Sequence, residues 1–202
     1  MTYPTTARTL LGNIEHNLRG IRARVGDRLV LAAVKANAYG HGAAAVSQMI
    51  ERTGAADWLG VATVEEGLQL RDAGVSLPIL KFSPTRDVDD VTRALLAGIT
   101  LSVVDEASIA QVAAAADALD LSEVAVHLKV DTGMASSGRR CGRPRVGGVH
   151  RRPPTPFASA GVFSHLPISD SSGPGDDFTR HQTRLFVDTM TGRSRPSPGL
   201  SN

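Results

Sequence analysis

A lysine and a tyrosine four residues apart, in the stretch AVKANAYGHG, are the residues of this sequence that most directly suggest chemistry. Lys35 closes an apolar run that begins at residue 29, and a charged amine in such a place is unfavourable unless it has a use. A partly desolvated lysine has a lowered pKa, and its neutral amine can attack a carbonyl carbon to form a Schiff base. The alternative is a lysine whose aliphatic stem packs at the strand end while its ammonium reaches water.

Two more reactive side chains stand near the ends of apolar runs. Lys129 is the second-last residue of the run 124–130, and His165 follows the run 160–164. Because reactive groups of a parallel α/β barrel lie at the carboxyl ends of its strands, we expect Lys35, Lys129 and His165 at one end of the fold. Pyridoxal phosphate is the carbonyl cofactor that most often explains such a lysine. For His165 the simpler alternative is a ring that bonds the backbone where its strand ends.

The elements that position these residues alternate regularly along the chain. Apolar runs predict strands over 29–35, 58–62, 78–82, 99–104, 124–130 and 160–164. Helical patterns cover 8–24, 42–53, 63–73, 86–97, 106–119 and 176–190. This alternation predicts an α/β fold, an incomplete (β/α)8 TIM-type barrel of about six βα units, with a doubly wound sheet as the second choice. A whole barrel typically needs ~250 residues.

Local signals mark where several of these helices begin and end. Thr63 and Glu66 have the spacing of a capping box, and Asp105 suits the N-cap of the helix that follows it. Glycines that favour a left-handed residue follow three of the helices, at positions 54, 74 and 98.

The stretch around Lys35 resembles the cofactor-attachment signature of bacterial alanine racemases, a pyridoxal-phosphate family with an N-terminal (β/α)8 barrel and a C-terminal β domain. Other stretches resemble the family in the same order, namely IEHNLRGIRARVGD, DWLGVATVEEGLQLRDAGVSLPIL, HLKVDTGM and GVFSHLPISD…DDFTRHQ. The resemblance covers residues 8–134 and 160–186 and implies that the chain, 1–202, is part of the barrel domain. The implied activity is that of an isomerase which interconverts L- and D-alanine through a pyridoxal-phosphate aldimine, supplying D-alanine for peptidoglycan.

The resemblance also implies roles for individual residues. Lys35 would hold the cofactor and act as the base on one face of the substrate, and Tyr39 would bond the cofactor phosphate. His165 would lie near the pyridine ring, and Lys129 matches a lysine that the family often carbamylates to orient a neighbouring arginine. Ser136 replaces that arginine. Because serine cannot supply a bidentate cation, we expect weaker recognition of the substrate carboxylate.

Residues 135–157, ASSGRRCGRPRVGGVHRRPPTPF, depart from both the helical pattern and the family. Proline and glycine disfavour a helix there, so the segment is predicted to be irregular, as is the tail 191–202. The segment has about the length of the family's corresponding segment but a foreign composition. Paired frameshifts in a GC-rich gene would produce this combination, and resequencing the gene would test that hypothesis. The sequence is therefore expected to be a truncated and partly scrambled family member, without the C-terminal β domain and impaired or inactive alone.

The composition limits the expected cellular location and the classes of binding partner. The net charge is +2. Residues 132–169 contain no acidic residue and six arginines, at positions 139, 140, 143, 145, 151 and 152, so the remainder of the chain has a net charge of −4. Such a block is usually a solvated loop, so nucleic-acid binding ranks last among the functions. The single cysteine, Cys141, offers no metal cluster and favours a cytoplasmic location. A membrane span and a signal peptide are not expected.

Two further functions stay open at this point. A non-catalytic pyridoxal-phosphate-binding barrel has about this length, although the attachment loop of those proteins lacks NAYGHG. The second open function is a racemase of another amino acid, such as lysine or serine. The expected partner is a small-molecule substrate, alanine. The resemblance implies a homodimeric family, but the C-terminal domain that forms its interface is expected to be missing here. Neither nucleic acid nor membrane is expected, and no metal.

Overall fold

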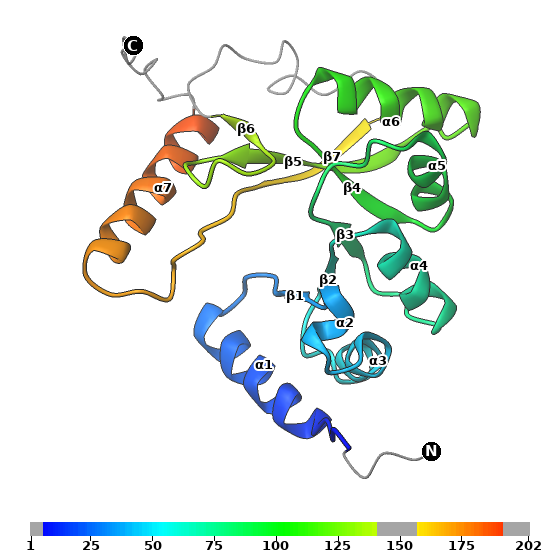
Figure 1. Ribbon diagram of the computed structural model, residues 1–202. Coiled ribbons are helices and arrows are strands. Elements are labelled where there is room, and N and C mark those ends of the chain that lie inside the picture. The colour runs from blue at the N-terminus through cyan, green and yellow to red at the C-terminus, as the bar shows by residue number, and fades with distance from the viewer. Residues whose placement is uncertain (1–5, 141–156, 192–202) are drawn as a thin grey trace. The chain divides into compact units, whose positions relative to one another are not determined.

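The computed structural model describes residues 6–140 and 157–191, which group into two compact units (Figure 1). The first unit comprises residues up to 83 together with 89–101, and the second comprises 84–88 and the residues from 102 onward. The strand β4 contributes residues to both of them.

The first unit is built from short parallel strands that alternate with helices. In chain order its elements are α1 (Leu11–Val25), β1 (Leu31–Ala33), α2 (Lys35–Tyr39), α3 (Ala43–Thr53), β2 (Trp58–Val61), α4 (Val64–Asp72), β3 (Ile79–Lys81), α5 (Val88–Leu96) and β4 (Ile99–Val103). Each strand pairs in parallel with the next, with Leu59 opposite Ile79 and Ile79 opposite Ile99. The side chains of Leu59, Ile79 and Val91 are fully buried, so the core lies between the strands and their covering helices.

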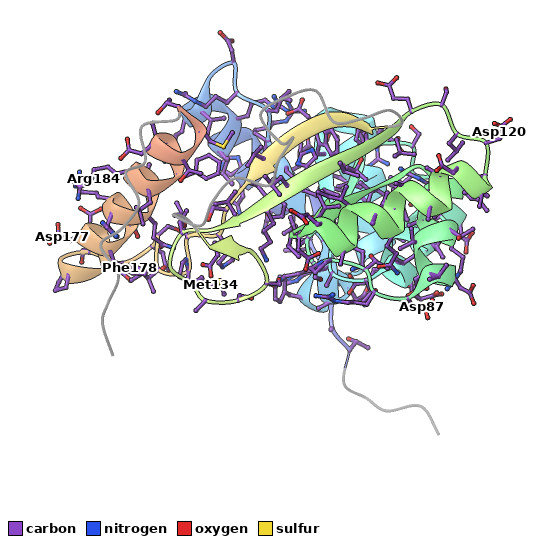
Figure 2. All side chains as sticks on the ribbon, turned by 90° about the horizontal axis from the view of Figure 1, so that it is seen from above. Asp87, Asp120, Met134, Asp177, Phe178 and Arg184 are labelled. Carbon is purple, nitrogen blue, oxygen red and sulfur yellow. The ribbon has the colours of Figure 1, made fainter. Side chains whose placement is uncertain are left out.

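The second unit continues the same alternation with longer strands. It contains α6 (Glu106–Ala118), β5 (Val124–Asp131), β6 (Arg139–Arg140), β7 (Phe157–Phe163) and α7 (Pro174–Met190). Both β6 and β7 run parallel to β5. The register of the pairing between β5 and β7 shifts between Val126 and His127. Burial of the His127 side chain lowers the pKa of its imidazole. Phe178 on α7 lies against Gly133, beside the turn that carries Met134 (Figure 2).

Parallel strands in sequence order, separated by helices, confirm the predicted fold class, an incomplete TIM-type α/β barrel. The two-residue strand β6 lies inside the segment 135–157. Residues 141–156 of that segment, and the tail from residue 192, lie outside the described residues. Among the described residues, none of the helices has the length and apolar character needed to cross a membrane.

The local signals for helix ends are confirmed. The Thr63 hydroxyl accepts the Glu66 amide at 3.1 Å, and the Glu66 carboxylate reaches back to the Thr63 amide. Asp105 forms a second capping box, with Ser108. The backbone at glycines 54, 74 and 98 has φ angles of 62°, 80° and 61°.

The end of the first strand needs a correction. The predicted strand 29–35 ends at Ala33 in the structure, and Lys35 is the first residue of α2 instead of the last residue of β1. The Val34 amide still bonds the Gly60 carbonyl at 2.9 Å, so the chain leaves the sheet immediately before the lysine.

Candidate functional site

The turn that carries Lys35 has an unusual backbone. Residues 36–39, none of them glycine, have φ angles between 51° and 53°, the left-handed region. For an L-residue with a Cβ this conformation costs roughly 1–2 kcal/mol per residue. Such a turn persists only where surrounding contacts fix it, and strain of this kind is often found at functional sites.

Three side chains supply those contacts. The Glu66 carboxylate accepts the Ala36 amide at 2.7 Å, and the Asn37 side-chain oxygen accepts the Ala43 amide at 2.8 Å. The Nδ1 atom of His41 lies 2.8 Å from the Ala38 carbonyl oxygen. The histidine therefore supports the backbone of the turn.

The turn places an amine beside a phenol. The Lys35 Nζ atom lies 5.8 Å from the centre of the Tyr39 ring, at the carboxyl end of β1. Lys35 is half-buried, whereas Tyr39 is 65% exposed. A primary amine can hold a carbonyl group, and a nearby hydroxyl can donate to an anionic group of the same ligand.

A third lysine occupies a comparable place and was missed by the sequence reasoning. Lys81 is the last residue of β3, is only 6% exposed, and donates from Nζ to the Ser83 carbonyl at 2.8 Å. Burial lowers the pKa of the Lys81 ammonium, and the nearby carboxylates of Asp90 and Glu66 partly restore it. Its position near the end of the apolar run 78–82 is the signal that could have revealed it, because all three lysines of the chain lie near the ends of apolar runs.

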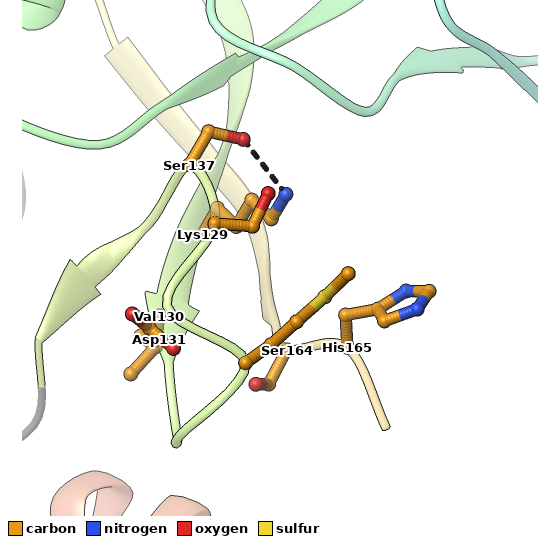
Figure 3. A pocket seen from close by; sticks show the side chains of 8 residues that line it. Lys129, Val130, Asp131, Ser137, Ser164 and His165 are labelled. Atoms are coloured by element: carbon orange, nitrogen blue, oxygen red, sulfur yellow. Dashed lines mark hydrogen bonds between the residues drawn. The ribbon is translucent and has the colours of Figure 1, made fainter. Parts of the chain in front are cut away.

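The second unit holds an open pocket at the carboxyl end of β5 (Figure 3). It is shallow and open to solvent, and it is lined by Lys129, Val130, Asp131, Met134, Ser136, Ser137, Ser164 and His165. The Lys129 ammonium donates to the Ser137 hydroxyl at 3.0 Å. One oxygen of Asp131 accepts the amides of Gly133 and Ala135, so this carboxylate shapes the turn after the strand.

A buried glutamine behind this pocket is a second residue that the sequence reasoning missed. Gln182, on α7, has no exposed surface, and its amide nitrogen donates to the Thr132 hydroxyl and the His165 carbonyl, each at 3.2 Å. Thr132 in turn bonds Ser164 at 2.7 Å. Gln182 therefore fixes the backbone at His165. Its place within an amphipathic helix gave no sign of burial at that depth.

The predicted site residues fall into two groups. Lys35 and Tyr39 lie together in the first unit, whereas Lys129, Ser136 and His165 line one pocket of the second.

Comparisons with known proteins agree on one family. The family description "Alanine racemase, N-terminal domain" matches residues 10–198. An alanine racemase of Cutibacterium acnes is 43% identical over 190 residues, which are 93% of this chain and 49% of that protein. An alanine racemase of Mycolicibacterium smegmatis is 36% identical over 181 residues, 88% of this chain and 45% of that protein.

Solved structures show the same relationship. The alanine racemase of Clostridium difficile 630 in complex with cycloserine superposes with a TM-score of 0.83 and 26% identity, over 96% of this chain and 54% of that one. The alanine racemase of Bacillus anthracis with bound L-Ala-P gives a TM-score of 0.78 and 26% identity, over 94% and 49%. The chain spans about half the length of the curated relatives it matches. With residues 10–198 matching the N-terminal domain, this chain belongs to the alanine racemase family.

Proposed function

We propose that this chain is the cofactor-bearing part of an alanine racemase, which interconverts L- and D-alanine. The observation that carries the proposal is the left-handed turn after β1, which holds the Lys35 amine 5.8 Å from the Tyr39 ring centre. This turn lies within the residues that match the N-terminal domain of the family.

The residues of the turn fit pyridoxal phosphate. The half-buried Lys35 amine suits its carbonyl carbon, and the exposed Tyr39 hydroxyl can donate to its phosphate. When bound, the cofactor supplies an electron sink for the charge that develops at the substrate α-carbon. Lys35 would hold the cofactor, and its Nζ amine would remove or return the substrate α-proton on one face. Tyr39 keeps the phosphate in place while this happens.

The pocket of the second unit would serve recognition. From the family resemblance, His165 is proposed to lie near the pyridine ring. Lys129, which donates to Ser137, is proposed to be the lysine that the family often carbamylates to orient a neighbouring arginine. Ser136 offers one hydroxyl where the family has an arginine, so the substrate carboxylate is held by fewer and weaker bonds.

Racemisation needs a proton donor on the face opposite Lys35. The family resemblance assigns that group to a tyrosine of the C-terminal domain, contributed across a dimer. We therefore propose that the 202 residues assayed alone give little racemisation, and that the racemase acts as a homodimer on alanine in the cytoplasm, to which the single cysteine points. A cofactor-binding chain without racemisation is the second candidate, and Ser136 favours it.

The experiment that tests the proposal separates one-face chemistry from racemisation. The chain is incubated with pyridoxal phosphate and either L- or D-alanine in D2O, and α-deuterium and chirality are both measured. A single base on one face predicts exchange of the α-proton in one enantiomer, with little inversion, and loss of this exchange in Lys35→Ala. Exchange in neither enantiomer, while the cofactor is bound, supports the second candidate. Exchange that persists in Lys35→Ala contradicts the role of Lys35.

A further inference from the structure

The carboxylate of Glu66 touches the turn of Lys35 from a distant part of the sequence. One of its oxygens accepts the Ala36 amide at 2.7 Å. The other accepts the Ala62 amide at 2.7 Å and the Thr63 amide at 3.3 Å. A single side chain therefore joins the residue after Lys35 to the end of β2.

The bond to Ala36 falls at the first strained residue of the turn. Ala36 has φ 52° and ψ 47°, which is unfavourable for alanine, and its amide has no helical acceptor at the start of the turn. A charged acceptor strengthens such a bond to an amide relative to a neutral one. The carboxylate thus holds the conformation at the residue that directly follows Lys35.

Lys81 is a second side chain that joins the ends of neighbouring strands, β3 and β2. Its ammonium is buried at the end of β3, and it interacts electrostatically with both Asp90 and Glu66. It also ties the strand ends together, because it donates to the Ser83 carbonyl and the Ser83 hydroxyl donates to the Ala62 carbonyl at 3.1 Å.

We propose that Glu66 is a positioning residue for the Lys35–Tyr39 pair, holding the left-handed turn through the Ala36 amide. This inference rests on the proposed function, because it assigns the turn the task of presenting Lys35 to pyridoxal phosphate. Glu66 acts through the backbone and does not itself touch the ligand. Without it, the turn relaxes and Lys35 leaves its place beside Tyr39.

The test compares Glu66→Met with Glu65→Met. Methionine keeps the length of the side chain and removes both acceptor oxygens. The control removes a neighbouring acid from the same helical turn, an exposed residue that bonds only Arg93 among the interactions described. Loss of one charge-assisted bond predicts at least about tenfold faster exchange of the Ala36 amide in Glu66→Met. It also predicts an increase of about tenfold in the pyridoxal phosphate concentration that half-saturates Lys35, measured by borohydride trapping and peptide mass.

A rescue variant separates positioning from general damage. Because glycine adopts the left-handed region freely, Ala36→Gly added to Glu66→Met should bring the half-saturating concentration back to within about threefold of the unchanged chain. The exchange of the amide at position 36 should stay fast, since the carboxylate is still missing. Misfolding caused by the loss of Glu66 would not be repaired in this way.

The other outcomes are also decisive. If Glu66→Met does not fold, Glu66→Gln replaces it. Glutamine keeps the shape of the side chain but offers one neutral acceptor oxygen in place of two charged ones, and a half-saturating concentration raised by about threefold supports the proposal. Unchanged exchange and unchanged trapping in either variant overturn it, as does an equal loss in Glu65→Met. If the unchanged chain traps no cofactor at all, the proposed function fails, and the exchange rate of the Ala36 amide alone decides whether Glu66 holds the turn.

Discussion

Replacing Arg71 by methionine tests how the amino-terminal ends of β3 and β4 are held together. The Arg71 guanidinium donates to four backbone carbonyls in the loops before these strands, those of Val75, Leu77, Ala97 and Gly98, at 2.8, 2.9, 3.0 and 3.3 Å. Methionine keeps the apolar stem of the side chain and removes every donor.

The expected loss follows from these bonds. A hydrogen bond from a charged donor contributes about 1.5–3 kcal/mol, and a buried acceptor left without a partner is penalised. Three of the four bonds are partly buried, while the one to Gly98 is exposed. Because the four acceptors share one group and water can reach part of the space left, we expect a loss of about 3 kcal/mol in the free energy of unfolding. For a chain of this length that lowers Tm by roughly 6–12 °C.

The assay is urea or thermal unfolding followed by circular dichroism, with two comparison variants. Arg71→Lys keeps the charge but not the fork of donors, so it should lose about half as much. Arg93→Met removes an exposed arginine whose partners, Glu65 and Asp90, are also exposed, and it should leave the midpoint nearly unchanged. A loss below about 1 kcal/mol for Arg71→Met would refute the reasoning, as would an equal loss for Arg93→Met.

Other changes in the first unit and the capping boxes give further expected outcomes. The Val30 amide and the Arg22 guanidinium lower the pKa of the Asp57 carboxyl. The contribution of Asp57 to stability is therefore present near neutral pH and is lost as the pH falls below about 4. Asp57→Asn should flatten the acid limb of a profile of unfolding free energy against pH. Thr63→Ala or Asp105→Ala removes a capping hydroxyl or carboxylate and should lower the free energy of unfolding by about 1 kcal/mol in denaturant titrations. Gly60→Ala places a Cβ against the Phe82 ring and 2.8 Å from Leu31, so a loss of about 1–3 kcal/mol is expected in the same titrations.

The parts of the fold that the sequence predicts are those whose causes are local. The capping box at Thr63 depends on a residue three positions away, and the strands other than β6 could be recognised from their own apolar runs. The pairing of Lys35 with Tyr39 was also within reach, because both residues lie in one short stretch. These features need no knowledge of what packs against them.

The features that escaped prediction depend on distant parts of the chain. Alanine favours a right-handed helix, yet Ala36 and Ala38 are left-handed because Glu66, Asn37 and His41 hold the turn. The burial of Lys81 follows from the packing around β3, and that of Gln182 from the packing of α7 against the turn after β5. Neither burial can be read from the residues next to it in sequence.

The central claim is that Lys35 is the residue that binds pyridoxal phosphate covalently, and reductive trapping tests it most directly. The chain has only three lysines, Lys35, Lys81 and Lys129, so borohydride treatment with the cofactor followed by peptide mass analysis can assign every labelled side chain. We expect label on the peptide that contains Lys35, and loss of that label in Lys35→Ala. Label distributed equally over the three lysines, or its complete absence from Lys35, would show that Lys35 is not the attachment residue.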